Sequence, residues 1–224
     1  MQRDTVLSHV EAELVAGRLR VGDRLPGERA LAAQLGISRA SVREGIRVLE
    51  AMGVIRTAAG SGPESGAVVV ADTAAGITSA LRLHLASSTL PVADVVRTRV
   101  LLETWGVREA ARHRDREQLD AARVLLDAMD RTDLVEEFLR LDAEFHVTLS
   151  RAAGNGVVAA IMTALRGAIH GYVLAVAPDD WLPTARRLRR QHRNVLAAIE
   201  AGDGERAARL VARHIEGFYR MAQL

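Results

Sequence analysis

The stretch LPGERALAAQLGISRASVREGIRVLEAMG, residues 25–53, constrains the fold more than any other part of the chain. Its apolar residues recur at three- and four-residue spacing, which predicts two short helices separated by a tight turn. Pro26 can open the first helix, because its fixed φ suits the first turn, and Gly36 can adopt the left-handed conformation that ends it. Ser38 is a suitable N-cap for the second helix. The apolar positions of that helix are Val42, Ile46 and Leu49, and Gly53 ends it.

The outer face of the second predicted helix carries Arg39, Ser41, Arg43 and Arg47. Any amphipathic helix has a charged outer face, and on the arginines alone a solvated surface is the commoner case. However, two helices around a tight turn are also the layout of a helix-turn-helix, whose second helix enters the major groove of DNA with its N-terminal turns. The surrounding sequence decides between the two readings.

Three motifs follow one another within about thirty residues: Leu25-Pro26-Gly27-Glu28-Arg29, Leu35-Gly36-Ile37-Ser38 and Ser41-Val42-Arg43-Glu44. In this region the chain closely resembles the GntR family of bacterial transcription regulators. The resemblance implies a winged helix-turn-helix that binds double-stranded operator DNA. It implies that Arg39 and Arg43 read bases and that Arg29 and Ser41 contact the backbone or adjacent bases. Ser38 and Gly66 complete the expected DNA-binding set.

The composition excludes several kinds of chemistry. The chain has no cysteine, which excludes disulfides, thiolate chemistry and iron–sulfur ligation and suits a reducing cytosol. It also has no lysine, since all 30 basic residues are arginine, which excludes lysine Schiff bases and the P-loop lysine. The net charge is only +2, and residues 1–72 carry nine arginines against nine acidic residues. The DNA interpretation therefore depends on the motifs and not on net charge.

The sequence shows no targeting or membrane segment. The N-terminal residues lack the apolar run of an export signal, and the most apolar stretch, Val157–Leu165, is far shorter than the roughly 20 residues that span a bilayer. We therefore expect a soluble, cytoplasmic protein with no membrane partner.

Two elements flank the predicted helix pair. Residues 4–16 have the pattern of a helix, with Asp4 as a possible cap. After Gly53 come two β-prone runs, residues 54–57 and 67–70, joined by residues 58–66, which predicts a hairpin. The GntR resemblance identifies this hairpin as the wing. Its tip is longer than the family's Arg-Gly-x-Gly-Thr-Phe pattern, and Glu64 would place a carboxylate near phosphates, so the helix is expected to make more of the DNA contacts.

Beyond Asp72 the periodicity is helical nearly to the end of the chain. The expected spans are 74–87, 92–112, 115–130, 133–152, 156–176, 181–201 and 204–222. Aromatic residues make up only 3% of the chain, so aliphatic side chains must fill the core, which suits closely packed helices. The predicted fold is mainly α, with a winged helix-turn-helix in residues 1–72 and an all-α bundle of about seven helices in residues 73–224.

Four side chains in the predicted bundle form a candidate metal site. Asp142 and His146 are four residues apart, which places both on one helix face. His192 lies ten residues before Gly202 and His214 twelve after it, so an antiparallel helix pair would bring both to one layer. An Asp–His pair alone is more often a surface contact or a buried hydrogen bond. One carboxylate and three imidazoles together suit a divalent transition metal with open coordination positions, most readily Zn²⁺, with Ni²⁺ or Mn²⁺ as alternatives.

The same region resembles the FCD effector-binding domain of the FadR-like branch of the GntR family. The matching stretches are Asp142-x-x-Phe145-His146, His192-x-x-x-Leu196-x-x-Ile199, Gly202-Asp203 followed by Ala207-Ala208 and His214, and Arg99-x-x-x-Glu103. The resemblance implies that Asp142, His146, His192 and His214 bind a metal, and that an organic acid completes its coordination. Arg99 is either a solvated helix arginine or a cavity residue that pairs with the effector carboxylate. His9, His84, His113 and His170 show no comparable convergence.

These observations favour a metal-dependent, ligand-responsive DNA-binding repressor that binds a palindromic operator as a homodimer and responds to a small carboxylate. Two alternatives remain at this point. An open His₃Asp site could activate water for hydrolysis, with Glu144 or Glu103 as the base. Alternatively, the metal itself could be the signal, although the absence of cysteine argues against a dedicated soft-metal sensor. Because the enzyme reading leaves the N-terminal domain without a purpose, we expect no enzymatic activity.

Overall fold

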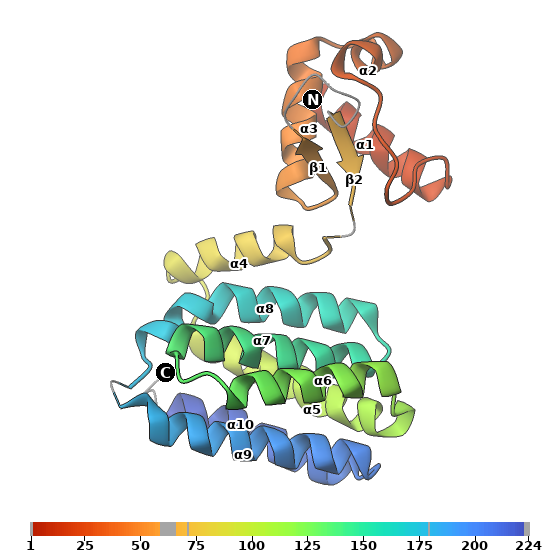
Figure 1. Cartoon of the computed structure of the whole chain (residues 1–224). Helices are drawn as coiled ribbons and strands as arrows, with labels where there is room; N and C mark the ends of the chain where they lie inside the picture. Colours follow the sequence, from red (N-terminus) through yellow and green to blue (C-terminus); the bar gives the residue numbers. More distant parts are fainter. Residues whose placement is uncertain (1, 59–65, 71, 179, 222–224) are drawn as a thin grey trace. The chain divides into compact units, whose positions relative to one another are not determined.

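The computed structural model describes residues 2–58, 66–70, 72–178 and 180–221. The chain divides into two compact units, Met1–Ile77 and Thr78–Leu224, each with its own hydrophobic core. Within the described residues there are ten helices and one two-stranded hairpin (Figure 1). The fold class is therefore the one that the sequence predicts: mainly α, with a winged helix-turn-helix followed by a helical bundle.

The first unit is a three-helix core with a hairpin. Its elements are α1 (Gln2–Val15), α2 (Glu28–Leu35), α3 (Arg39–Ala51), β1 (Ile55–Ala58) and β2 (Gly66–Val69). Gly36 ends α2 in the left-handed conformation, with φ of 66°. Ser38 caps α3, since its side chain accepts a hydrogen bond from the Ser41 N–H. These two residues fix the tight turn of the helix-turn-helix, as their residue types predict.

Two details of the helix starts differ from expectation. The N-cap of α2 is Gly27 and its first residue is Glu28, so Pro26 precedes the helix instead of opening it. Asp4 is not a cap, because α1 already begins at Gln2 and Asp4 lies in its first turn. In that position its carboxylate lies near the positive end of the helix dipole and stabilises the helix.

The hairpin pairs β1 and β2 antiparallel, with Ile55 opposite Val69 and Ala58 opposite Gly66. Glu50 at the end of α3 anchors it, because its carboxylate accepts from both the backbone N–H and the hydroxyl of Thr57, at 2.8 and 2.5 Å. These two hydrogen bonds lower the pKa of Glu50. The expected tip of the wing, including Glu64, falls in residues 59–65 and lies outside the described residues.

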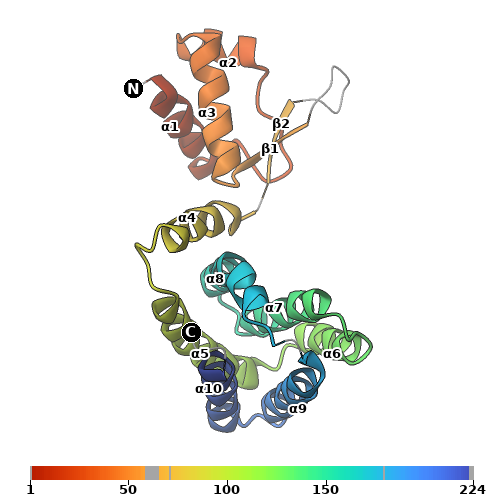
Figure 2. The same cartoon turned by 90° about the vertical axis from the view of Figure 1, so that its left-hand side faces the viewer.

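All seven helices expected after residue 72 are present. They are α4 (Ala75–Ala86), α5 (Val92–His113), α6 (Arg116–Asp130), α7 (Val135–Ala152), α8 (Gly156–Ala175), α9 (Trp181–Glu200) and α10 (Gly204–Met221). Helix α7 packs against α5, α6 and α8, while α10 packs against α5 and α9. Figure 2, which shows the bundle closer to end-on, has α7 between α6 and α8. Helices α7, α9 and α10 are therefore able to direct side chains into a common interior.

Helix α8 is more apolar than the sequence reading allowed. The helix spans 20 residues with a mean hydropathy of 1.5, which by length and composition alone would be enough to cross a membrane. Its side chains Met162, Leu165 and Ile169 are buried in the core of the bundle. Arg166 lies among them, also buried. Val157, Gly167 and Gly171 are exposed, so α8 packs one face on the core of the bundle and leaves another face outside it.

Candidate functional site

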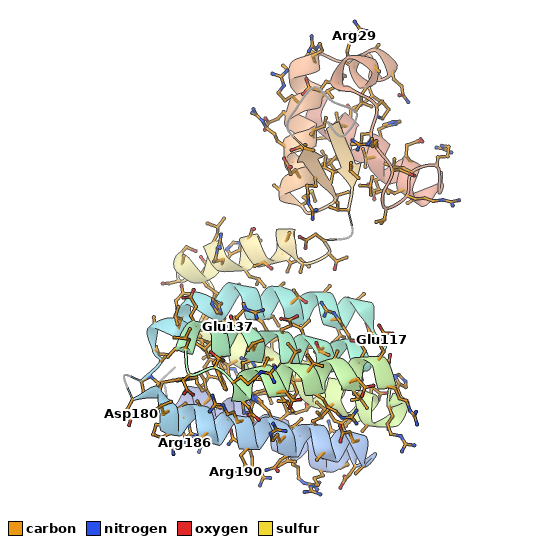
Figure 3. The ribbon with its side chains drawn as sticks, viewed as in Figure 1. Arg29, Glu117, Glu137, Asp180, Arg186 and Arg190 are labelled. Carbon is orange, nitrogen blue, oxygen red and sulfur yellow. The ribbon has the colours of Figure 1, made fainter. Side chains whose placement is uncertain are left out.

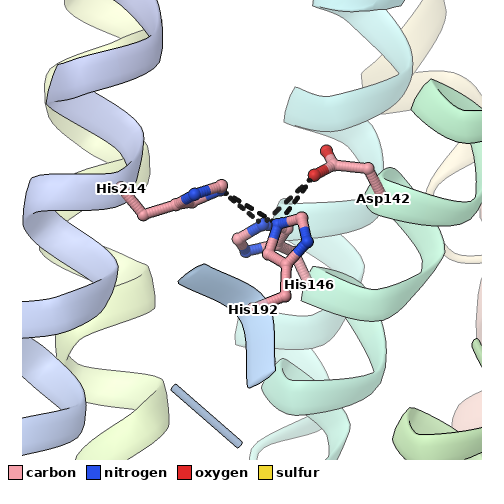
Figure 4. A group of neighbouring side chains, drawn as sticks. All are labelled: Asp142, His146, His192 and His214. Carbon is pink, nitrogen blue, oxygen red and sulfur yellow. Dashed lines mark hydrogen bonds and ion pairs between the residues drawn. The ribbon is translucent and has the colours of Figure 1, made fainter. Parts of the chain in front are cut away.

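Four buried side chains from three helices form the centre of the candidate site. Helix α7 contributes Asp142 and His146, α9 contributes His192, and α10 contributes His214. Figure 4 shows the four side chains directed toward one another. The structure thus brings together every residue that the spacing argument assigned to a metal site.

The donor atoms of this cluster are close enough to share one ion. His146 Nε2 and His192 Nε2 each lie 3.2 Å from His214 Nε2. Asp142 Oδ1 is 3.0 Å from His192 Nε2 and 3.7 Å from His146 Nε2. Ligand atoms held about 2 Å from one tetrahedral Zn²⁺ lie about 3.3 Å from each other. The residues present therefore fit a divalent metal ion.

Three of the four residues have a further partner on the side away from the cluster. Glu103 Oε2 lies 2.5 Å from His146 Nδ1, which brings a carboxylate against the imidazole. Gln191 Oε1 is 3.1 Å from His214 Nδ1. The guanidinium of Arg166 on α8 pairs with Asp142 Oδ2, which leaves Oδ1 directed at the histidines. Such outer contacts fix the orientation of metal ligands.

Burial and neighbouring charges set the protonation of the cluster. Burial lowers the pKa of His146 to about 4, although Glu103 opposes the shift. Burial and the neighbouring histidines hold the pKa of His214 well below its usual range. Burial alone would raise the pKa of Asp142, but Arg166 and the hydrogen-bonded His192 outweigh it and hold that pKa well below its usual range. A neutral imidazole and an ionised carboxylate are the forms that bind a metal.

The cluster borders a small pocket with a cavity volume of about 30 Å³. The polar lining consists of Arg99, Asp142, Arg166, His170 and His214, and the other walls are mainly apolar. Arg99 is only 3% exposed, so the structure places it at the pocket and not in solvent. His170, for which no role was expected, lines the same pocket. A small anion that enters this pocket would lie beside the Asp–His cluster and two guanidinium groups.

Neither glutamate considered as a hydrolytic base is available for that role. Glu144 is exposed and pairs with Arg140 at 3.0 Å. Glu103 is buried between Arg99 and His146, and although burial alone would raise its pKa, these two partners lower it. A base needs a pKa near the working pH and reach to a water molecule. Each carboxylate is already committed to another side chain.

The predicted DNA-binding residues lie on α2, on α3 and at the start of β2. Arg29, Ser38, Arg39, Arg43 and Gly66 are exposed, Ser41 is half-buried, and Figure 3 shows Arg29 on the outer side of α2. Ser38 is occupied as the helix cap. The Arg43 guanidinium is not free in solution, because Nη2 and Nε lie 2.9 and 3.2 Å from the Glu28 carboxylate.

Several residues of the site were missed in the sequence reading. Arg166 could have been noticed as the single charge within an otherwise apolar helix. Glu103 was noticed only as the end of an Arg–Glu pair and as a possible base. No local pattern indicates Gln191, Tyr219 or the Glu28 contact with Arg43, because these contacts depend on how separate helices pack.

Comparisons with known proteins agree with both halves of this description. Residues 94–217 match the model of the FCD domain, and residues 2–64 match that of "Bacterial regulatory proteins, gntR family". The chain is 28% identical over 200 residues to the HTH-type transcriptional repressor NanR of Cronobacter sakazakii, covering 88% of this chain and 76% of that protein. It is 29% identical over 199 residues to NanR of Escherichia coli K12, covering 87% and 74%.

Solved structures show the same fold. A GntR protein of Streptococcus agalactiae superposes with a TM-score of 0.68 at 21% identity, covering 98% of this chain and 100% of that one. The McbR/YncC protein of Escherichia coli gives a TM-score of 0.53 at 18% identity, covering 100% and 97%. The chain therefore belongs to the GntR family of bacterial regulatory proteins, as a transcriptional regulator with a C-terminal FCD domain and not as an enzyme.

Proposed function

We propose that this regulator is a metal-loaded repressor of the FadR-like branch, which binds a palindromic operator as a homodimer in the cytoplasm and releases it when a small organic acid binds beside the metal. Residues 1–72 would bind DNA, and residues 73–224 would bind metal and acid and hold the dimer together. The observation that carries the proposal is the convergence of Asp142, His146, His192 and His214 on one another, beside a pocket that Asp142 and His214 line together with two buried arginines. The repressors among the relatives support the direction of regulation.

Charge supports an acid as the ligand. The two arginines at the pocket are each paired with a carboxylate, Arg99 with Glu103 and Arg166 with Asp142. Because His146 and His214 are held neutral by burial, a divalent ion would add positive charge that the pocket side chains do not compensate. Uncompensated buried charge is costly, so an anion is favoured. The ion, most readily Zn²⁺, would act as a Lewis acid that binds a carboxylate of the ligand.

The pocket also favours an acid over the metal as the regulatory signal. A site that only senses a metal needs its four ligands and nothing more. Here two of the four, Asp142 and His214, line a pocket whose polar lining also includes Arg99 and Arg166, which are suited to anions. The metal is then a resident cofactor, and the acid is the variable component.

Metal analysis of the purified full-length protein tests the proposal. One divalent ion per chain is expected in the wild type, and loss of it in His192→Ala and His214→Ala. His113→Ala, an exposed histidine outside the cluster, is the matched control and should retain the metal. Full occupancy in both cluster variants would rule out the site.

The operator is tested separately. A DNA site selected by the protein from a random pool should contain an inverted repeat with half-sites about one helical turn apart, because each recognition helix of a symmetric dimer reads one half. A selected site without internal symmetry would contradict the proposed mode of binding.

A further inference from the structure

Glu103 lies between His146 of the Asp–His cluster and Arg99 of the pocket. It lies on α5, its side chain is 3% exposed, and its two carboxylate oxygens face different partners. Oε1 lies 2.9 Å from both Nε and Nη2 of Arg99, one helical turn earlier. Oε2 lies 2.5 Å from Nδ1 of His146 on α7. One carboxylate therefore touches a metal ligand and an effector-site arginine at the same time.

On the metal side, this contact differs from those of the other two histidines. A carboxylate 2.5 Å from Nδ1 favours a proton on that nitrogen, leaves Nε2 free to bind a metal, and makes the imidazole a stronger donor. His214 Nδ1 has only the neutral amide of Gln191. His192 Nδ1 has no hydrogen-bond partner among the described residues. His146 is therefore the ligand whose orientation and donor strength depend on a buried charge.

On the pocket side, Glu103 holds the guanidinium of Arg99 in place. Arg99 Nη1 donates to the hydroxyl of Tyr219 on α10 at 2.6 Å, and the guanidinium carbon lies 5.6 Å from the centre of the Tyr219 ring. With Glu103 on its other nitrogens, the guanidinium is fixed from two sides and faces the pocket. A long flexible side chain held in this way loses its conformational entropy before an anion arrives.

Building on the proposed metal site, we infer that Glu103 is a positioning residue that couples the metal to Arg99. Metal binding at His146 Nε2 makes the imidazole more positive. The attraction between His146 Nδ1 and Glu103 Oε2 then becomes stronger. Because the same carboxylate also binds Arg99, the position and the hydrogen bonds of the Arg99 guanidinium change with it. The pocket thus takes its anion-binding form together with the metal, although Arg99 itself contacts none of the four ligands.

Nuclear magnetic resonance of the arginine Nε–H groups in the full-length wild-type protein tests this coupling directly, with Zn²⁺ as the only added component. The Arg99 Nε–H signal, identified by its loss in Arg99→Gln, should shift when zinc is added. The Arg189 Nε–H, which donates to the Met129 carbonyl at 2.9 Å and touches no residue of the cluster, should stay in place. Zinc binding without a shift of the Arg99 signal would overturn the inference.

Variants at position 103 supply a second measurement, namely the zinc affinity from competition with a chelator. Glu103→Gln removes the charge, and Glu103→Asp keeps it but shortens the side chain so that it no longer reaches both partners. Both should bind zinc about 10–100-fold more weakly, and the Co²⁺ absorption spectrum of each should change. If Glu103→Asp binds zinc as the wild type does, the carboxylate acts only through its charge and the bridging role is wrong. A wild-type protein that binds no zinc would instead overturn the proposed metal site itself.

Discussion

At the scale of single residues, Arg43, the side chain proposed to read bases, is held by a carboxylate on the neighbouring helix. Its guanidinium forms two hydrogen bonds with Glu28 on α2, and this pair lowers the pKa of Glu28. The pair is exposed, so it contributes little to stability, and exchanging it for a guanine edge costs little. Glu28 therefore orients the arginine, and the pair is weak enough to be exchanged for the proposed contact with a base.

Replacing Arg43 by Ala should weaken binding to the selected operator by about 1–3 kcal/mol and relax base preference at one position in each half-site. Gel-shift titrations on the operator and on single-base variants measure both effects. Arg20→Ala, an exposed arginine outside α2 and α3, is the control and should leave base preference unchanged. Equal affinity and equal base preference for Arg43→Ala would remove it from the DNA interface.

The buried histidines predict how the metal-free protein responds to acid. The pKa of His146 is about 4 in the folded chain and about 6.5 when unfolded. The unfolded chain therefore binds a proton in a pH range where the folded chain does not, and acidification from about pH 6.5 to 4 favours unfolding. His146 alone contributes on the order of 3 kcal/mol to this loss, and His214 adds to it in the same direction.

Urea unfolding of metal-stripped protein between pH 4 and 8 should show this decline. His146→Gln should flatten the pH dependence, whereas replacement of the exposed His84 should leave its slope unchanged. If the stability of the metal-free wild type is the same at pH 7 and pH 5, His146 is not buried in its neutral form.

Much of the site was predictable because its parts are set by helix geometry. The four-residue spacing pairs Asp142 with His146, and the similar distances of His192 and His214 from Gly202 pair those two, whereas the meeting of the two pairs was implied only by the family resemblance. The contacts around them are different. Arg166 approaches Asp142 from α8 and Tyr219 approaches Arg99 from α10, and no short-range pattern specifies how α8 and α10 pack on their neighbours.

At the scale of elements, the close approach of α1 and α3 depends on one glycine. Gly45 lies in the middle of α3, where a Cβ atom would be 2.6 Å from Val6 Cβ and 2.9 Å from both of its methyl carbons. Glycine is normally unfavourable in a helix by about 1 kcal/mol relative to alanine. Here glycine is still favoured, because Val6 is fully buried against this position and leaves no room for a Cβ atom.

Gly45→Ala should therefore destabilise the first unit by about 1–3 kcal/mol despite the better helix propensity of alanine. The loss should be smaller in a Val6→Ala background, which removes two of the three contacting carbons, so the two substitutions are not additive. Thermal unfolding measures each effect. Gly171→Ala in α8, where nothing lies within 4 Å of a new Cβ, is the control and should not destabilise the protein. A neutral Gly45→Ala would contradict the tight contact of α1 and α3.

The elements themselves followed from the sequence wherever a strong local signal was present. Gly36 and Ser38 mark the turn correctly, because each residue type serves one backbone conformation. Pro26 and Asp4 were misplaced, since several adjacent residues were acceptable helix starts. The apolar run in α8 was predicted to end at Leu165, which is too short. Arg166 interrupts the apolar pattern there, but it stays buried through its pair with Asp142, and the apolar helix continues to Ala175.

At the scale of the whole molecule, the outer face of α5 is a candidate for the dimer contact. Leu101 is 71% exposed and Trp105 is 36% exposed, and the two lie one helical turn apart. Leu101→Glu should shift the protein toward monomer in light scattering at micromolar concentration, because a carboxylate would be buried in the contact. Leu134→Glu, at an equally exposed leucine before α7, should remain dimeric. A dimeric Leu101→Glu would place the interface on another face.

Binding of the acid and of the operator must influence each other if the protein is a ligand-controlled repressor. The acid can release DNA only by binding the DNA-incompetent form more tightly, and a complete switch from 1:99 to 99:1 requires about 10⁴-fold preference, roughly 5.5 kcal/mol. By linkage, the operator must weaken acid binding by the same factor by which the acid weakens operator binding.

Calorimetric titration of hydroxy acids and dicarboxylates into zinc-loaded protein, with and without operator DNA, measures that factor. Arg99→Gln, which removes the guanidinium from the pocket but touches none of the four metal ligands, should reduce acid affinity while the zinc remains bound. An acid that binds with the same affinity in the presence and absence of operator is a passive ligand, and the repressor would then need a different signal.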